Sequence, residues 1–102
     1  MAEVKNHLEL EKVDQEFSAW KLLNDGKTEI VRVHLEPGEC IDTHINSLVV
    51  IFFILAGTGA LTVEGNGFNL KKDDAIRVEK GLSRKWHNTA EESLEFLVIK
   101  QL

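Results

Sequence analysis

The chain has 102 residues, of which 43% are hydrophobic and 28% charged, and its formal net charge is -5. This length and composition indicate one globular domain, residues 1–102, with enough apolar side chains for a core of its own. The negative charge and the dispersed basic residues argue against a nucleic-acid partner. The longest apolar run, residues 48–56, is too short for a membrane helix, which needs about 20 residues.

The N-terminus and the cysteine content bear on the compartment. The first residues contain no apolar segment of the kind that directs secretion. The single cysteine, Cys40, cannot form an internal disulfide, which fits a reducing environment. We therefore expect a cytoplasmic protein with no membrane partner.

The predicted elements are short strands joined by turns. Residues 17–23 and 28–35 form a hairpin through the turn at 24–27, and a helical turn is plausible only at 10–16. Pro37 and Gly38 end the second strand, and glycines at 57 and 59 interrupt the long apolar run. The later segments are a hairpin of 60–64 and 68–71 through 65–67, a turn at Gly81, a loop at 88–93 and a strand at 94–100. Strands at this spacing are typical of an all-β sandwich or barrel.

The run 48–55 is apolar on both faces of the expected strand. One face can line a barrel, but the other needs a second covering layer. A second copy of the chain is the simplest source of that layer, so we expect a homodimer. The N-terminal segment folding over the strand is the alternative.

Two segments of the chain resemble the conserved motifs of the cupin superfamily, in its small single-domain cupin 2 type. The first motif of the family has glycine, His-x-His, glutamate and glycine, and the matching positions here are Gly38, His44, Asn46, Val50 and Gly57. The second motif has Gly-Asp, Pro-x-Gly, histidine and asparagine, and the matching positions are Asp73, Asp74, Glu79, Gly81, Arg84 and Asn88. The resemblance implies a double-stranded β-helix, or jelly-roll barrel, over residues 28–100, with an N-terminal extension at 1–27.

The same resemblance implies a site for a divalent metal, held in the family by three histidines and one glutamate. At those positions this chain has His44, Asn46, Val50 and Arg84, so one ligand of the four remains. An amide oxygen is a poor donor for a transition metal, an aliphatic side chain is none, and a guanidinium repels a cation. We therefore expect no metal and no other cofactor.

The altered pocket has a different chemistry. If the family register holds, alternation places His44, Asn46, Leu48 and Val50 on one inward face, and Arg84, Trp86 and Asn88 on another. A buried guanidinium needs an anion, and its fork suits a carboxylate or a phosphate. An acidic side chain of the protein could satisfy Arg84 instead, or Arg84 could lean out of the barrel mouth. Likewise, Trp86 either stacks on a ligand or packs as part of the barrel.

Three functions remain open at this point. The first is a small-molecule-binding protein that captures a small organic anion through His44, Asn46, Arg84 and Trp86. The second is an isomerase, epimerase or lyase with His44 as acid or base, or a metalloenzyme in which His44 joins Cys40 or Glu39. The third is a structural subunit without a ligand. The fold alone does not separate these alternatives.

Overall fold

The structure is a computed structural model that describes residues 2–13 and 17–102. A 3-10 helix and nine strands occur in these residues. In chain order they are η1 (His7–Glu9), β1 (Ser18–Asn24), β2 (Thr28–Leu35), β3 (Cys40–Ile45), β4 (Val50–Ala56), β5 (Thr58–Val63), β6 (Asn66–Lys71), β7 (Ala75–Val78), β8 (Ser83–His87) and β9 (Leu94–Gln101). The prediction of an all-β chain is confirmed.

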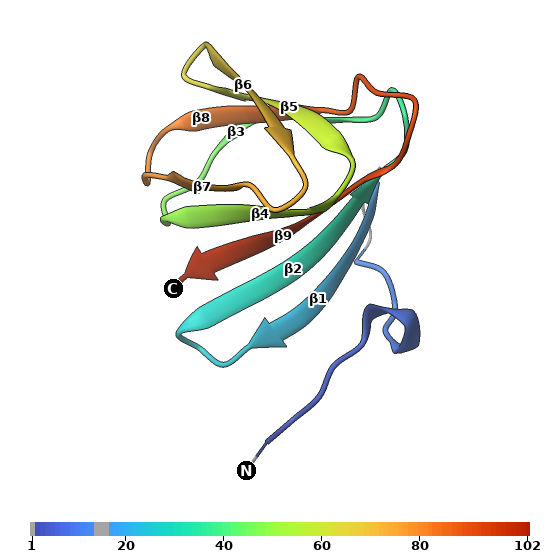
Figure 1. The fold of residues 1–102 in the computed structure, drawn as a ribbon. Helices are drawn as coiled ribbons and strands as arrows, with labels where there is room; N and C mark the ends of the chain where they lie inside the picture. Colours follow the sequence, from blue (N-terminus) through green and yellow to red (C-terminus); the bar gives the residue numbers. More distant parts are fainter. Residues whose placement is uncertain (1, 14–16) are drawn as a thin grey trace.

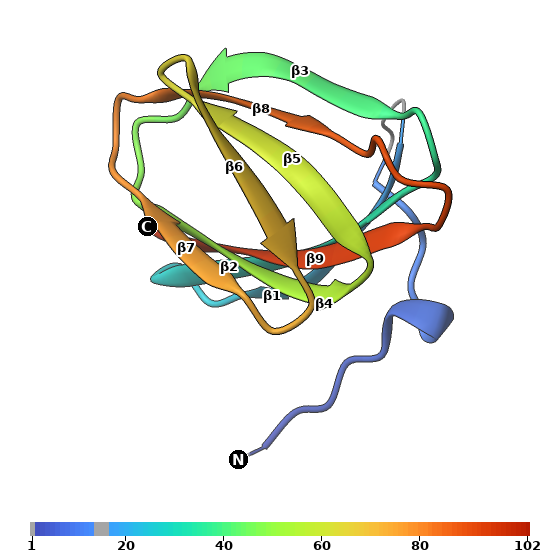
Figure 2. The same ribbon diagram turned by 45° about the horizontal axis from the view of Figure 1, so that its top comes forward.

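The strands form two sheets that face each other (Figures 1 and 2). The first sheet has the order β1-β2-β9-β4-β7, and the second has the order β3-β8-β5-β6. Every pairing between neighbouring strands in this part of the chain is antiparallel. Because β4 and β9 lie in one sheet while β5 and β8 lie in the other, the chain crosses repeatedly between the layers, as in a jelly-roll barrel.

Side-chain alternation builds the core between the two sheets. Along β9, Leu94, Phe96 and Val98 are buried, and the residues between them are only partly buried. Along β4 the same pattern buries Val50 and its inward neighbours at 52 and 54. Each strand therefore has one apolar face that it can bury only against the opposite sheet.

The turns follow the residues that tolerate a positive φ. The first predicted hairpin is confirmed as β1–β2, and Asp25 Oδ1 accepts the backbone N–H groups of Lys27 and Thr28 within its turn. The predicted break after the apolar run is confirmed at Gly57, which has φ +80. A Cβ atom at Gly57 would lie 2.3 Å from the carbonyl oxygen of Ser93, so the chain can pass there only as glycine.

The β5–β6 hairpin differs from its prediction. The turn is Glu64-Gly65 rather than residues 65–67, since Asn66 already pairs with Val63 in the ladder. Glu64 has φ 48 and Gly65 has φ 79, the backbone of a two-residue hairpin turn of the primed kind. Glu64 accepts the backbone N–H and the hydroxyl of Ser83, which holds a non-glycine residue in this conformation.

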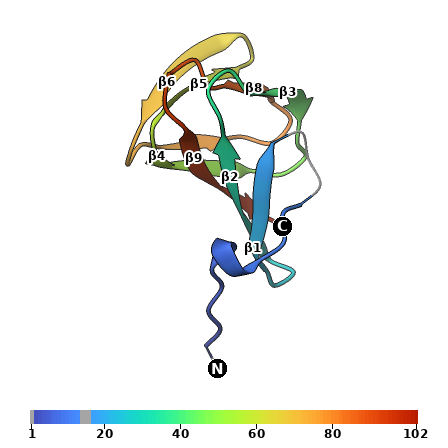
Figure 3. The same ribbon diagram turned by 90° about the vertical axis from the view of Figure 1, so that its right-hand side faces the viewer.

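The N-terminal segment lies beside β1 (Figure 3). The helical turn is η1, earlier than the predicted 10–16, because Asn6 caps it by accepting the backbone N–H of Leu8. Residues 11–13 are not helical, and 14–16 lie outside the described residues. The His7 ring meets the edge of Trp20 with centroids 5.0 Å apart, which attaches η1 to β1. Within the described segments, no helix has the length and apolarity needed to cross a membrane.

The outward face of β4 carries Ile51, Phe53 and Leu55, which are partly exposed. The neighbouring strand β9 adds Leu97 and Ile99 to the same face, because Ile51 pairs with Ile99 and Phe53 pairs with Leu97. The main contacts of η1 are with β1. The expectation that a further layer covers this face stays a prediction.

Candidate functional site

A cavity of about 420 Å³ lies between the two sheets. The side chains that line it come from the segment before β1 and from β1, β2, β3, β4, β8 and β9. They are Val13, Phe17, Ala19, Lys21, Glu29, Val31, Val33, Ile41, His44, Phe52, Arg84, Trp86, Phe96, Val98 and Lys100. A largely apolar cavity with a few charged groups is the usual form of a small-molecule site.

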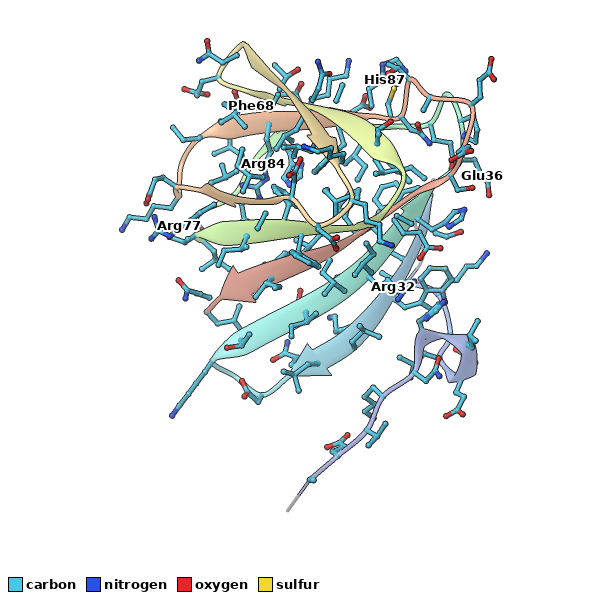
Figure 4. All side chains as sticks on the ribbon, in the orientation of Figure 1. Arg32, Glu36, Phe68, Arg77, Arg84 and His87 are labelled. Atoms are coloured by element: carbon cyan, nitrogen blue, oxygen red, sulfur yellow. The ribbon has the colours of Figure 1, made fainter. Side chains whose placement is uncertain are left out.

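Arg84 is the most unusual group in the cavity. Its position on β8 directs the side chain between the sheets (Figure 4), where it is only 2% exposed. Among the described residues, neither its Nε nor its Nη1 has a hydrogen-bond partner, and no carboxylate forms an ion pair with it. Its guanidinium carbon lies 5.7 Å from the centre of the Phe52 ring, a modest cation–π contact.

Burial lowers the pKa of Arg84 from its ordinary value. That starting value is so high that the guanidinium stays protonated at neutral pH. The cavity therefore holds a fixed positive charge that the described protein atoms leave without a counter-charge.

His44 lies next to Arg84 across the sheet. The two residues are direct partners in the β3–β8 ladder, and both line the cavity. Directly opposite residues place their Cβ atoms about 5 Å apart on the same face. His44 is exposed, so it stands where the cavity opens to solvent, with Arg84 deeper in the barrel.

Trp86 lies two residues after Arg84 on the same inward face of β8. Its ring stacks on Phe96 with centroids 4.3 Å apart and meets the edge of Phe52 at 5.3 Å. Its Nε1 is buried and has no acceptor in the described part of the chain. Trp86 therefore packs in the barrel and also forms part of the cavity wall, and its stacking on a ligand stays a prediction.

Asn46 is placed differently from its expectation. β3 ends at Ile45 and β4 begins at Val50, so the alternation that was continued through Asn46 and Leu48 stops in a loop. Asn46 Oδ1 accepts the backbone N–H of Leu48 at 2.9 Å, and its carbonyl oxygen accepts that of Gly81 at 2.8 Å. Asn46 shapes this loop and is not among the described residues that line the cavity.

Three charged residues of the cavity were missed by the sequence reasoning. Glu29 Oε1 lies 3.3 Å from Lys100 Nζ, and Glu29 Oε2 lies 3.5 Å from Lys21 Nζ. Burial alone would raise the pKa of Glu29, but its hydrogen bond with Lys100 and the charges of both lysines outweigh burial and lower it. A signal existed in the sequence, because Glu29 shares the parity of Val31 and Val33.

The other metal-ligand candidates do not meet at His44. Glu39 Oε1 accepts the backbone N–H of Glu36, and Cys40 pairs with His87 on β8. Neither lines the cavity, and Val50 is fully buried in β4. Across residues 2–13 and 17–102, no group of three or more histidine, cysteine, aspartate or glutamate side chains is placed to hold a metal ion.

The fold and the sequence are similar to known proteins. The cupin domain family matches residues 31–100. A curated relative, 5-nitrosalicylic acid 1,2-dioxygenase from Bradyrhizobium sp., is 29% identical over 68 residues, covering 67% of this chain and 33% of that protein. The chain therefore spans about a third of the length of this relative.

Solved structures agree over nearly the whole chain. One described as a predicted oxalate decarboxylase from Thermotoga maritima has a TM-score of 0.86 at 25% identity, covering 99% of both chains. An RmlC-like cupin with a double-stranded β-helix fold from Methanocaldococcus jannaschii has a TM-score of 0.79 at 26% identity, covering 91% of this chain and 86% of the other. KdgF from Halomonas sp. has a TM-score of 0.87 at 15% identity, covering 100% of this chain and 96% of that one, and shows the fold alone.

Proposed function

This chain belongs to the cupin domain family, and from that membership we propose that it is a small-molecule-binding protein whose barrel cavity holds a small organic anion. The observation that carries the proposal is Arg84. A guanidinium buried without a counter-charge costs free energy, and proteins keep such costs mainly where function requires them. A carboxylate or phosphate in the cavity would supply the missing charge through two parallel hydrogen bonds.

The residues at the family's metal positions do not fit a transition-metal ion. His44 offers an imidazole, but Asn46 uses its side-chain oxygen within its own loop. Val50 offers no donor atom, and Arg84 places a positive charge where the metal would lie. We therefore derive no step through a metal, and we treat the changed donor set as support for an anion site.

A titration with simple anions tests the proposal. Acetate, succinate, benzoate and inorganic phosphate are added to the purified protein, and binding is followed by calorimetry and by the shift in Tm. At least one of them should bind and raise Tm, and Arg84→Gln should weaken that binding about 100-fold. Arg77→Gln is the matched control, since Arg77 is exposed, pairs with Glu79 and does not line the cavity. Equal binding by both variants would overturn the proposal.

An enzyme is the second candidate, and one observation favours it. His44 and Arg84 face the same cavity from adjacent strands, so an acid or base stands beside the group that would hold the anion. A His44→Ala variant that retains binding but loses turnover of a bound acid would support an isomerase, epimerase or lyase. Unchanged turnover in His44→Ala would show that His44 is not the catalytic acid or base.

We also propose that a second copy of the chain covers the outward face of β4 and β9. Ile51, Phe53, Leu97 and Ile99 form an apolar patch, whereas the main contacts of η1 are with β1. A self-complementary contact between two such patches would bury the outward apolar face of β4, a strand that is apolar on both faces. Phe53→Glu should convert a dimer into a monomer in light scattering, and a wild-type protein that is already monomeric would contradict this proposal.

A further inference from the structure

The charged and apolar side chains of the cavity occupy opposite ends of the barrel. The charged set comes from the middle of β1, the start of β2, the end of β3, the start of β8 and the end of β9. The ladders bring these positions together, since Glu29 pairs with Lys100 and His44 pairs with Arg84. Lys21 and His44 are exposed, so this charged end is where the cavity meets solvent.

The other end of the cavity is apolar. Ala19 pairs with Val33, Val33 pairs with Phe96, and on the opposite sheet Ile41 pairs with Trp86. The stack of Trp86 on Phe96 joins the two sheets at this end, and Val13 and Phe17 also line the cavity there. A ligand that reaches past the charged end therefore meets hydrocarbon and aromatic surface, together with the unpaired Nε1–H group of Trp86, among the described residues.

Three fixed cations, Lys21, Arg84 and Lys100, and one carboxylate, Glu29, line the cavity, which leaves a net charge of +2. The carboxylate of Glu29 is already shared between Lys21 and Lys100. Arg84 is then the one cation in the described lining without a carboxylate partner. A single carboxylate balances the buried charge of Arg84, and the excess charge beside Glu29 lies at Lys21, which is exposed to solvent. A second charge on the ligand that entered the apolar end would carry a high desolvation cost.

We infer that the ligand is a monocarboxylate with a compact aromatic or branched hydrocarbon body, an inference that rests on the proposed anion-binding function. The carboxylate lies on Arg84 near the open end, and the hydrocarbon body lies between Val33, Ile41 and Trp86. The cavity of about 420 Å³ has room for such a body, and an ion as small as acetate or phosphate leaves the apolar end without contacts. Each methylene group that enters it strengthens binding about fourfold.

Calorimetric titration of the full chain with acetate, benzoate, succinate and inorganic phosphate tests this class. Benzoate should bind about 100-fold more tightly than acetate, from its larger apolar body. It should also bind more tightly than succinate and phosphate. Val33→Thr keeps the shape of the side chain and places a hydroxyl in the apolar end. This substitution should weaken the binding of benzoate about tenfold and leave the binding of acetate nearly unchanged. A second readout is a nuclear Overhauser contact between the benzoate ring protons and the Ile41 methyl groups, which needs no variant.

The outcomes separate this inference from the function on which it rests. Acetate, succinate or phosphate could bind as tightly as benzoate, with binding that still depends on Arg84. In that case the proposed anion site is supported, and the inference of an aromatic or branched monocarboxylate is overturned. If no anion binds, or if Arg84→Gln changes nothing, both proposals fall. Selective benzoate binding that Arg84→Gln and Val33→Thr each weaken supports both.

Discussion

Two arginines of this protein, one on the outer surface of the barrel and one inside it, have opposite environments. Arg32 of β2 donates from Nη2 to Glu95, and the other Glu95 oxygen accepts from His34, which also contacts Glu36 at 2.7 Å. We call these four residues the outer network. Arg84 is more deeply buried and has no such partner among the described residues (Figure 4).

The difference separates charges that the fold pairs from a buried charge that the described residues leave unpaired. In the outer network, Arg32 and His34 of β2 pair with Glu95 of β9 and so link the two strands, and His34 also pairs with Glu36. In the cavity, the neighbours of Arg84 across its ladders are His44 and Val63, neither of which is acidic. A buried cation that the described residues leave unpaired supports the proposal of a bound anion.

The largest expected effect comes from giving Arg84 an internal partner. His44→Glu places a carboxylate beside Arg84 and makes the cavity resemble the outer network. We expect it to weaken benzoate binding roughly 100-fold, because the new carboxylate occupies the guanidinium. His44→Gln removes the imidazole without adding the charge, and it should weaken binding much less. Calorimetric titration with benzoate measures the affinity of each variant. Equal affinities would show that the added carboxylate does not compete with benzoate for Arg84.

The next effect is on stability. Arg84→Met removes a buried charge without a partner, so it should raise the free energy of unfolding of the ligand-free protein by about 1–3 kcal/mol. Arg32→Met should lower it, because Glu95 then loses a partner. Denaturant titration in buffer without organic anions measures both variants. A loss of stability in both would mean that Arg84 is paired in solution.

A smaller effect is expected at the centre of the outer network. Glu95→Gln keeps the shape of the side chain but removes the charge shared by Arg32 and His34. Since these side chains are largely buried, we expect a loss of about 1 kcal/mol in the free energy of unfolding. Glu79→Gln, at the exposed pair with Arg77, is the control and should change stability little. A loss at Glu79 as large as that at Glu95 would contradict the special role of the network.

The smallest effect is the pH dependence that His34 adds. Burial alone would lower the pKa of His34, but its hydrogen bonds with Glu95 and Glu36 outweigh burial and raise it above 6.5. The folded state therefore binds the proton more tightly than the unfolded state. This stabilisation is fully present below pH 6.5, the unfolded value, and is lost as the pH rises through the folded pKa.

Denaturant titrations across this pH range measure the contribution. Wild type should lose less than about 1 kcal/mol as the pH rises, and the loss should shrink in His34→Gln. His87→Gln is the control, because His87 contacts no carboxylate among the described residues. If the free energy of unfolding of His34→Gln falls with pH as steeply as that of wild type, the pH dependence belongs to another group.

The strands and most turns could be predicted because they depend on local patterns. Alternation predicted β1, β2 and β9 to within a residue or two at each end, and Gly57 marked the break after β4. The β5–β6 turn was misplaced because Gly65 and Gly67 are both glycines, and only the ladder register shows which of them turns. The position of Asn46 was misjudged because a spacing motif does not reveal where one strand ends and the next begins.

By itself, the sequence determined the all-β barrel and its family resemblance, because strand alternation and glycine positions are local properties of the chain. It predicted that Arg84 and Trp86 share one face, and that this face points inward only if the family register holds. Only the tertiary structure decided that no acidic side chain of the described residues reaches Arg84. It also decided that Lys21, Glu29 and Lys100 gather at the same end of the cavity as Arg84. These facts depend on pairings between strands far apart in the chain and on the closure of one sheet over the other, which no local pattern specifies.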